Sequence, residues 1–264
     1  MDLKLNTKKA LVTGSTAGIG YAIARELAQE GATVIINGRK TKDVEAKVEK
    51  LKKETGNTQV LGIAADFSKK HEIQALLDEV SEVDILINNV GMFKEVEFGD
   101  ITDEEWLEIF EVNVMSGIRM ARHYFSKMLE RNEGRIVFIS SESALNIPTE
   151  MIHYGMSKTA QLAISRGLAR LTKGTHVTVN AVLPGPTKRR GVEEMLRQQS
   201  EANNKAVEEV EKEFFSKARP TSLIQRFADP EEVARLVAYV ASPLSSATNG
   251  AALRVDGGVV NSIL

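Results

Sequence analysis

Short apolar segments rich in β-branched residues alternate with longer segments of helical periodicity along most of the chain. Several short segments are apolar at every position, such as Val34-Ile35-Ile36 and Ile136-Val137-Phe138-Ile139. A strand that is apolar on both faces needs helices on both sides, which is the situation in parallel sheets. Alternation with right-handed crossovers therefore predicts an α/β fold: a single doubly wound parallel sheet of the Rossmann type, with about seven strands and helices on both faces.

The element boundaries follow from the same pattern. Strands are expected at Ala10–Thr13, Thr33–Asn37, Gln59–Ala64, Asp84–Asn88, Arg135–Ile139, Val177–Val182 and Ala251–Val255. Helices are expected at Ile19–Glu30, Thr41–Thr55, Lys70–Val80, Thr102–Arg131 and Met151–Thr172, and a further helix begins at Asp229-Pro230-Glu231-Glu232. Ligands of such sheets bind outside the carboxyl ends of the strands, so the chemistry is expected just after each strand.

One charge-dense segment, Lys188–Arg219, has helical composition and no strand. Since no internal repeat or linker accompanies it, the 264 residues are predicted to form one dinucleotide-binding catalytic domain (1–264) with an insertion at about 188–219. Two interpretations of the insertion stay open here. It is either a solvated pair of surface helices or a mobile lid over a substrate.

Composition excludes several classes of function. Lys and Arg number 34 and Asp and Glu 36, a net charge of −2, which gives no electrostatic footprint for nucleic acid or an anionic membrane. The absence of cysteine excludes disulfides, thiolate zinc sites and cysteine nucleophiles. The four histidines are scattered, so no metal site is expected. No apolar run approaches membrane-spanning length, and a cytoplasmic protein is expected.

A glycine-rich turn, Thr13-Gly14-Ser15-Thr16-Ala17-Gly18-Ile19-Gly20, joins the first strand to the first helix. Glycines let the backbone approach a ligand closely, and a helix N-terminus offers unpaired N–H groups to a pyrophosphate. A plain glycine-rich turn is the alternative. The position of this turn at the first strand–helix junction favours the nucleotide site.

The second strand is followed by Asn37-Gly38-Arg39-Lys40, with no carboxylate before Asp43. An acidic residue here would bind the adenosine ribose hydroxyls and repel a 2′-phosphate. A guanidinium suits a phosphate, so Arg39 indicates NADP, with NAD less favoured. A solvated basic turn is the alternative.

Tyr154 and Lys158 lie four residues apart in one helical segment, so their side chains share a face. A free tyrosine has a pKa of about 10, and a nearby ammonium favours its phenolate. Ser141 follows a buried strand, at the sheet edge where a hydroxyl could donate to a substrate oxygen. Ser140 is the rival to Ser141. Asn113 lies inside a helical run, where asparagine is intrinsically poor.

Together these motifs resemble the short-chain dehydrogenase/reductase family over nearly the whole chain except Lys188–Arg219. The matching positions are Gly14, Gly18, Gly20, Asp66, Asn88-Asn89-Val90-Gly91, Asn113, Ser141, Tyr154-x-x-x-Lys158, Pro184-Gly185 and Asp256-Gly257-Gly258. The spacing of Ser141 from Tyr154 resembles the family better than that of Ser140.

The resemblance implies an NADP-dependent oxidoreductase that interconverts a carbonyl and a secondary alcohol by hydride transfer, with Tyr154 as acid and base. It implies that Ser141 steadies the substrate oxygen, that Lys158 binds the nicotinamide ribose and that Asn113 holds a water leading to Lys158. The implied cofactor-binding residues are Gly14, Ser15, Gly18, Ile19, Gly20, Arg39, Asp66, Asn88, Gly91, Tyr154, Lys158, Pro184, Gly185 and Thr187. Asp66 could instead cap the next helix.

The resemblance further implies a homotetramer and a substrate-covering role for Lys188–Arg219. The alternatives are a catalytically weak cofactor-sensing or scaffold protein, and another Rossmann enzyme such as a methyltransferase, in which the tyrosine, lysine and serine would have no role. The substrate is a small molecule of open identity. Glu142 either repels anionic substrates or points to solvent, and other expected pocket residues are Met92, Phe93, Ile147, Met151 and Met156.

Overall fold

Seven parallel strands form one sheet in a computed structural model that describes residues 2–188 and 190–263. The strands lie in the order β3-β2-β1-β4-β5-β6-β7. Their bounds are β1 Lys9–Val12, β2 Thr33–Gly38, β3 Val60–Ala64, β4 Ile85–Asn88, β5 Gly134–Ile139, β6 Val177–Pro184 and β7 Ala252–Val255. The predicted fold class is confirmed.

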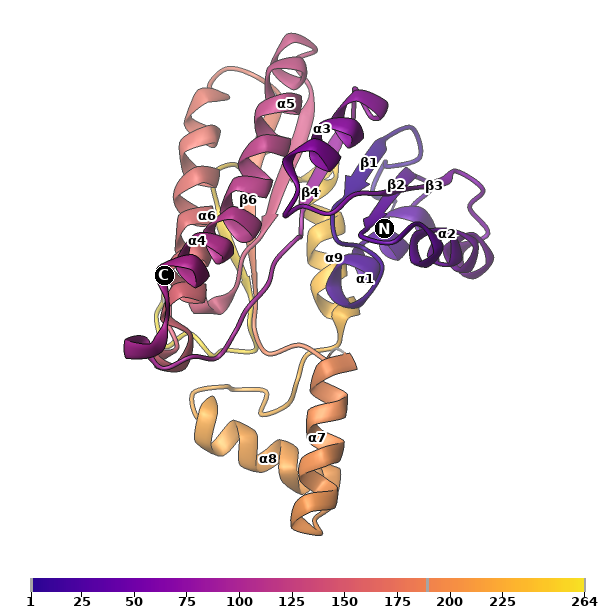
Figure 1. Cartoon of the computed structure of the whole chain (residues 1–264). Coiled ribbons are helices and arrows are strands. Elements are labelled where there is room, and N and C mark those ends of the chain that lie inside the picture. Colours follow the sequence, from indigo (N-terminus) through magenta and orange to yellow (C-terminus); the bar gives the residue numbers. More distant parts are fainter. Residues whose placement is uncertain (1, 189, 264) are drawn as a thin grey trace.

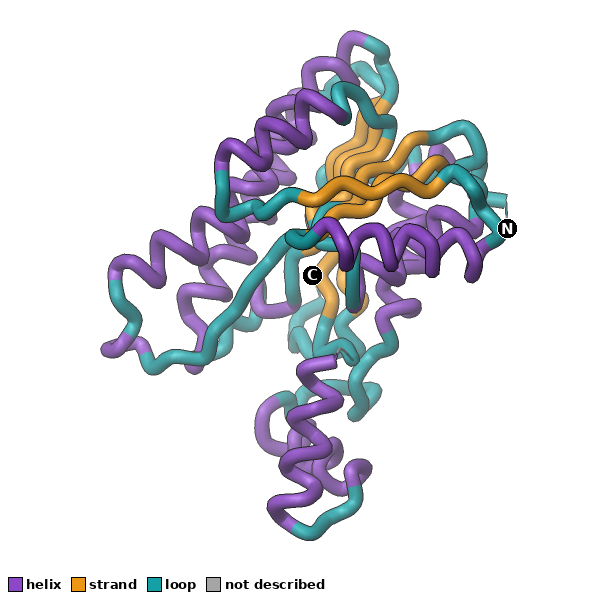
Figure 2. Tube along the Cα trace, turned by 45° about the vertical axis from the view of Figure 1, so that its right-hand side comes forward, coloured by secondary structure: helices purple, strands orange, loops and turns teal. Residues whose placement is uncertain are grey.

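Helices cover both faces of the sheet (Figures 1 and 2). Residues of α1 (Gly18–Gln29), α2 (Thr41–Thr55) and α9 (Pro230–Ala241) share a buried apolar cluster with Val12 and Ile36. Residues of α3 (Lys70–Glu79), α5 (Ser116–Glu130) and α6 (Ile152–Leu171) share a second cluster with Leu11 and Ile35. Neighbouring strand residues thus pack into opposite layers, which explains why these strands are apolar at every position.

The order in which strands are added to the sheet reverses at β1, which pairs with β2 on one side and with β4 on the other. After β3 the chain therefore crosses back over β1 to build the second half of the sheet. Such a change leaves a crevice at the carboxyl ends of the two central strands. The glycine-rich turn follows β1 at this crevice.

The expected helix Thr102–Arg131 is wrong as a single element. It consists of α4 (Asp103–Phe110), a π-helical turn (Glu111–Met115) and α5. The side chain of Thr102 accepts from the Glu105 N–H and begins α4 with a capping box. A π-helical turn changes the direction of backbone groups inside a helix and is frequent at functional sites. Asn113 lies in this turn.

The insertion forms two helices, α7 (Arg190–Asn203) and α8 (Val207–Ala218), which project from the body of the molecule (Figure 1). They carry an apolar cluster of their own, in which the rings of Phe214 and Phe227 stack at 4.9 Å. Its buried members are Val192, Leu196, Val210, Phe215 and Phe227. The helix pair is thus packed internally. In the described part of the chain, no helix is long and apolar enough to span a membrane.

Candidate active site

The glycine-rich turn has the backbone geometry that its sequence predicts. Gly14 and Gly18 have φ angles of 60° and 55°, in the left-handed region that favours glycine. A Cβ on Gly20 would lie 2.4 Å from the Asn89 Nδ2 and 2.6 Å from the Gly14 carbonyl oxygen. Helix α1 follows Ala17, which provides no side-chain cap. The first turn of α1 thus presents N–H groups suited to a pyrophosphate.

Two asparagines, to which the sequence motifs assign no role of their own, hold this turn in place. Asn37 at the end of β2 accepts a hydrogen bond from the Gly14 N–H at 3.0 Å. Asn89 after β4 donates from Nδ2 to the carbonyl oxygens of Thr13 and Gly14, at 2.9 and 3.0 Å. Asn89 also lines the cavities on both sides of the turn. The neighbouring Asn88 is placed differently: its side chain is buried near Gly117 and lines neither cavity.

A cavity of about 480 Å³ beside the turn brings Gly14, Gly38, Arg39 and Asp66 together. The carboxylate of Asp66 accepts from the Ser68 N–H and hydroxyl, at 3.0 and 2.8 Å, and these bonds lower its pKa. The alternative that Asp66 is the N-cap of the next helix is wrong, because the N-cap of α3 is Lys69.

Gly38 has no room for a side chain in this cavity. A Cβ on Gly38 would lie 2.5 Å from the Thr16 Cγ2 and 3.2 Å from its hydroxyl oxygen. An aspartate at this position would therefore displace Thr16. Arg39, the next residue, is exposed, and its charge helps to lower the pKa of Asp66. Arg39 thus places a guanidinium, a group that binds phosphates, in the wall of this cavity.

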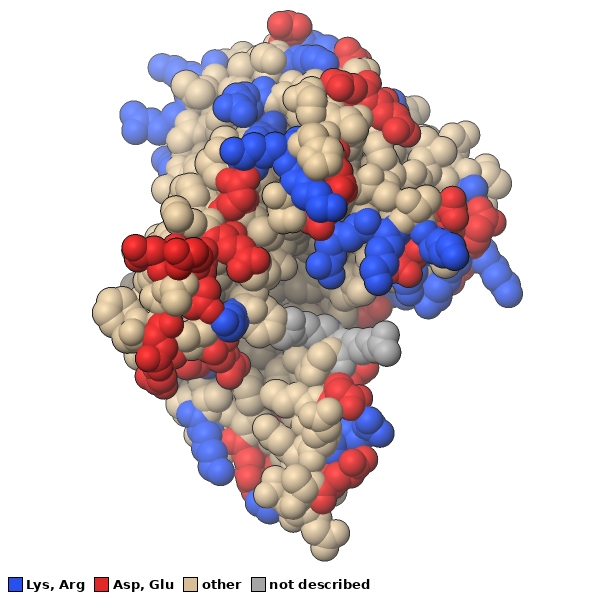
Figure 3. Space-filling model, in the orientation of Figure 1, with Lys and Arg blue, Asp and Glu red and all other residues tan. Residues whose placement is uncertain are grey.

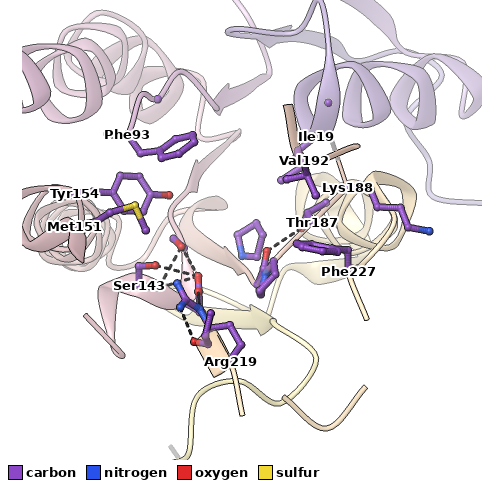
Figure 4. A pocket seen from close by; sticks show the side chains of 18 of the residues that line it. Ile19, Phe93, Ser143, Met151, Tyr154, Thr187, Lys188, Val192, Arg219 and Phe227 are labelled. Carbon is purple, nitrogen blue, oxygen red and sulfur yellow. Dashed lines mark hydrogen bonds and ion pairs between the residues drawn. The ribbon is translucent and has the colours of Figure 1, made fainter. Parts of the chain in front are cut away.

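A second cavity, of about 630 Å³, lies between the body and the α7–α8 pair, where the surface is hollowed (Figure 3). Tyr154 turns its hydroxyl into this cavity beside Phe93, with the two rings edge to face at 6.1 Å (Figure 4). The walls of the cavity also include Ile19 and Met151. Pro184 at the end of β6 and Gly185 and Thr187 in the loop after it complete this side. The described lining residues do not include Ile147 or Met156, and Met92 lines the smaller cavity.

Lys158 lies one turn after Tyr154 on α6 and is buried. Its ammonium nitrogen is 5.7 Å from the centre of the Tyr154 ring and donates to the Ile139 carbonyl oxygen at 2.9 Å. Burial lowers the pKa of Lys158 to about 8. The two side chains that share a face in the sequence pattern therefore meet in the structure.

The two candidate serines after β5 have different partners. The Ser141 hydroxyl donates to the Glu142 Oε2 at 2.5 Å and accepts from the Ser143 N–H at 3.1 Å. The Ser140 hydroxyl instead donates to the main-chain oxygen of Lys158 at 2.9 Å, which ties β5 to α6. Both serines lie in the wall of the larger cavity.

Glu142 does not point to solvent, so that sequence alternative is wrong; it lies in the wall of the larger cavity, and the repulsion of anionic substrates stays a prediction. Glu142 is buried, and its Oε1 accepts from the Arg219 Nε at 3.3 Å (Figure 4). Arg219 follows α8 and also lies 3.6 Å from Glu150. A buried ion pair thus joins the α7–α8 segment to the serine-bearing turn. No local pattern indicates this pair, because its members are 77 residues apart.

Asn113 is buried between the loop after β4 and α6. Its side chain accepts from the Met92 N–H at 2.7 Å and donates to the Ser157 hydroxyl at 2.9 Å. It thereby holds the loop after β4 against α6, and a Cβ on Gly91 in that loop would lie 3.3 Å from the Lys158 Nζ. Ser15 is buried too, and its hydroxyl donates to the Val12 carbonyl oxygen at 2.7 Å. Among the described residues, there is no group of three or more His, Cys, Asp or Glu side chains that could hold a metal ion.

Comparisons with known proteins agree with this geometry. A family model described as enoyl-(acyl carrier protein) reductase matches residues 14–260. An uncharacterized oxidoreductase of Bacillus subtilis, YvaG, is 50% identical over 263 residues, the full length of both chains. Dehydrogenase/reductase SDR family member 4 of Caenorhabditis elegans is 32% identical, covering 96% of this chain and 95% of the relative.

Among solved structures, L-sorbose reductase from Gluconobacter frateurii, complexed with NADPH and L-sorbose, superposes with a TM-score of 0.92 at 28% identity. The superposition covers 100% of both chains. The family model matches almost the whole chain, the relatives have matching lengths, and the sorbose reductase has the same fold. The protein is therefore an oxidoreductase of the NAD(P)-dependent short-chain dehydrogenase/reductase family.

Proposed function

We propose that the protein is an NADP-dependent reductase or dehydrogenase that interconverts a carbonyl compound and a secondary alcohol. The observation that carries this proposal is the placement of Tyr154 over a buried Lys158 in the wall of the cavity that the glycine turn also borders. When bound, the nicotinamide cofactor supplies or accepts the hydride. The residues of the chain then have to transfer one proton to or from the substrate oxygen and hold that oxygen in place.

Tyr154 is proposed as the proton donor in the reductive direction. The carbonyl carbon gains a hydrogen as hydride, its carbon–oxygen π bond breaks, and the oxygen takes the proton of the Tyr154 hydroxyl. This leaves a phenolate, which the ammonium of Lys158 stabilises. In the oxidative direction the same phenolate takes the proton of the alcohol. A lysine with a pKa of about 8 changes its charge near neutral pH, so it can also help to restore this proton.

Ser141 is proposed to donate its hydroxyl hydrogen to the same substrate oxygen. Ser140 is proposed to have only the structural role of binding the main chain of α6. The Glu142 carboxylate accepts that hydrogen in the structure, at 2.5 Å, and thereby keeps the hydroxyl in one rotamer. A substrate oxygen would take the place of this acceptor. The Asn113 side chain is proposed to keep the loop after β4 and α6 together around Lys158.

The function is tested by following NADPH absorbance with a panel of ketones, aldehydes, ketosugars and acyl thioesters. We expect oxidation of NADPH that depends on at least one carbonyl compound, with an alcohol as product in equal amount. Binding of NADPH with no turnover of any panel member or of the matching alcohols would instead favour the cofactor-sensing protein.

For the cofactor, we propose that Gly14, Gly18, Ile19 and Gly20 hold the pyrophosphate and that Arg39 binds a 2′-phosphate. Asp66 is proposed on the adenine, and Tyr154 and Lys158 on the nicotinamide ribose. Ser15, Asn88 and Gly91 act through the backbone or through packing, and Pro184, Gly185 and Thr187 lie on the nicotinamide side. The sorbose reductase with the same fold is complexed with NADPH, which supports the preference for NADP.

Arg39→Ala is expected to weaken NADPH binding by about 10- to 100-fold, the effect of one or two charged hydrogen bonds. NADH binding should change by less than about threefold, because NADH lacks the 2′-phosphate. Lys40→Ala is the matched control, since Lys40 is also exposed but lies outside the cavity lining given by the described residues. Titration of the three proteins by protein fluorescence measures both affinities. An equal loss for NADPH and NADH would remove this role of Arg39.

We further propose that residues 190–219 of the single domain cover the bound substrate. Val192, Met195 and Phe214 face the larger cavity from this segment. Limited digestion with trypsin, at Arg197, Lys205 and Lys212, is expected to slow about tenfold or more when NADP and a turned-over alcohol are both present, because closure lowers the population of open segments. Cleavage at Lys50 and Lys53 on α2 is the control. Equal cutting with and without ligands would contradict a covering role.

The homotetramer and the cytoplasmic location stay predictions. The exposed apolar side chains of α4 support a homo-oligomer, because Leu107 is 68% exposed and Phe110 38%. A second copy packed along α4 and α5 would remove this surface from water.

A further inference from the structure

Gln161 is buried on α6, one turn after Lys158, and both ends of its amide are engaged by groups of the site. Its Nε2 donates to the main-chain oxygen of Asn113 at 2.6 Å. Its Oε1 accepts from the Lys158 ammonium at 3.4 Å. The proposed function gives Gln161 no role, and no motif of the sequence includes it.

The direction of this amide follows from the chemistry of its two partners. A carbonyl oxygen can only accept a hydrogen bond, and an ammonium can only donate one. Turning the amide over would place oxygen against oxygen and NH₂ against ammonium, so only the observed orientation satisfies both contacts. A buried amide that is satisfied at both ends is held firmly in place.

The carbonyl oxygen that Gln161 contacts belongs to the π-helical turn between α4 and α5, in which Asn113 lies. The family resemblance implied a water between Asn113 and Lys158. Here the Gln161 amide spans from the Asn113 oxygen to the Lys158 nitrogen. An amide holds its N–H protons at neutral pH, whereas a water passes protons readily. Gln161 therefore positions Lys158 and does not carry protons.

We propose that Gln161 is a positioning residue that replaces this water, fixes the Lys158 ammonium below Tyr154 and favours its charged form. The inference rests on the proposed function of Tyr154 and Lys158. A hydrogen bond to the ammonium raises the pKa of lysine, which opposes the lowering caused by burial. A charged Lys158 in turn favours the phenolate of Tyr154.

Most other ionisable side chains near the Tyr154 end of α6 are paired in the structure. An exception is His153, a buried residue of α6 next to Tyr154, whose pKa is lowered by burial. Glu111 of the π-helical turn is paired with Arg119, and Glu142 after β5 with Arg219. Glu105 on α4 is paired with Lys94, and Tyr154 lies on α6 itself. Burial is the cause of the lowered pKa of Lys158, with no charge contributing. A change at Gln161 therefore acts on Lys158 and, through it, on Tyr154.

The test compares Gln161→Met, Gln161→Ala and the wild type. Methionine fills the space without accepting strongly, so the pKa of Lys158 should fall by about half a unit to one unit. In alcohol oxidation the rising limb of kcat against pH should move up by a similar amount, and kcat at pH 7 should drop about three- to tenfold. Alanine leaves room for a water that bridges the same two atoms, so Gln161→Ala should recover most of this shift.

Two measurements keep this inference separate from the proposed function. The pKa of Lys158 is read from the NMR shift of its ¹³C-labelled ε-carbon, without turnover, and the pH profile of kcat is read with an alcohol. Ser165→Ala is the control. Ser165 lies one turn after Gln161 on α6, and its buried hydroxyl has no hydrogen-bond partner among the described residues. This substitution should change neither the pKa of Lys158 nor the pH profile of kcat.

An unchanged pKa of Lys158 in Gln161→Met would overturn the inference, whatever happens to kcat or to stability. An unchanged pH profile together with a lower kcat would also overturn it, because that pattern indicates damaged packing. A wild type that turns over no alcohol or carbonyl would overturn the proposed function. The NMR result would still decide whether Gln161 tunes Lys158.

Discussion

Tyr154→Phe is expected to bind NADPH within about fivefold of the wild-type affinity, because one hydrogen bond to the nicotinamide ribose is lost, and to lose about 10³-fold in kcat, the range found for removal of a general acid. The substitution keeps the aromatic ring, so its edge-to-face contact with Phe93 and its place above Lys158 are retained. Only the hydroxyl that faces the cavity is removed. The forming alkoxide then lacks a proton donor, and the barrier rises by about 4 kcal/mol. Steady-state rates and a fluorescence titration measure the two quantities.

Tyr239→Phe is the matched control, because Tyr239 is a partly exposed tyrosine on α9, away from the cavity. It should keep the wild-type kcat and Kd. A Tyr154→Phe protein with more than about a tenth of the wild-type kcat would place the proton donor elsewhere. A joint loss of affinity and thermal stability would instead indicate that the hydroxyl is structural.

Lys158→Met is expected to be the second large effect, with losses in both kcat and NADPH affinity. The substitution keeps an unbranched side chain in the buried space and removes the ammonium. Tyr154 then loses the charge that favours its phenolate, and we expect kcat to fall by about 10³-fold. Affinity should fall by about tenfold, because a charged donor to the cofactor ribose is lost. Wild-type kcat in this variant would contradict the role of Lys158.

The same variant tests the burial of Lys158 through stability. In the folded protein its pKa is lowered to about 8 from 10.5. Between these values the unfolded chain binds more protons than the folded one, so the stability of the wild type relative to Lys158→Met rises with pH. The expected gain between pH 7 and pH 10 is about 2 kcal/mol.

Urea unfolding of both proteins at several pH values measures this difference, and the effects of groups that do not interact with Lys158 cancel. Making both comparisons in the Tyr154→Phe background removes the contribution of Tyr154. At pH 7 the burial of the charged ammonium lowers the free energy of unfolding of the wild type. Parallel stability curves for the two proteins would show that Lys158 keeps an ordinary pKa. That result would leave the geometry of the site unchanged but would remove the lysine as a group that titrates near neutrality.

The sheet was predictable because its signal is local. Ile35 and Ile36 pack into opposite layers, so each strand carries the evidence for two covering faces. The cofactor turn and the Tyr154–Lys158 pair were predictable for a similar reason, since their geometry follows from spacing within one turn or one helix. Boundaries differ by a residue or two at most elements, as with β6, which continues to Pro184 because it pairs there with Val255.

The contacts that tune the site were not predictable, because each joins residues distant in sequence. The side chain of Gln161 contacts the carbonyl oxygen of Asn113, which lies 48 residues away in the sequence and in a π-helical turn that helical periodicity does not reveal. Asn37 and Asn89 act on the glycine turn from two other strands. Arg219, just after α8, reaches Glu142, which lies 77 residues earlier in the chain.

A crystal structure of the protein with NADPH tests the central claim most directly. We expect the pyrophosphate on the first turn of α1, the 2′-phosphate beside Arg39, and the nicotinamide ribose within hydrogen-bond distance of Tyr154 and Lys158. The Tyr154 hydroxyl should face the reactive carbon of the ring. A phenol turned away from the nicotinamide, or a lysine that contacts only protein atoms, would contradict the proposed chemistry.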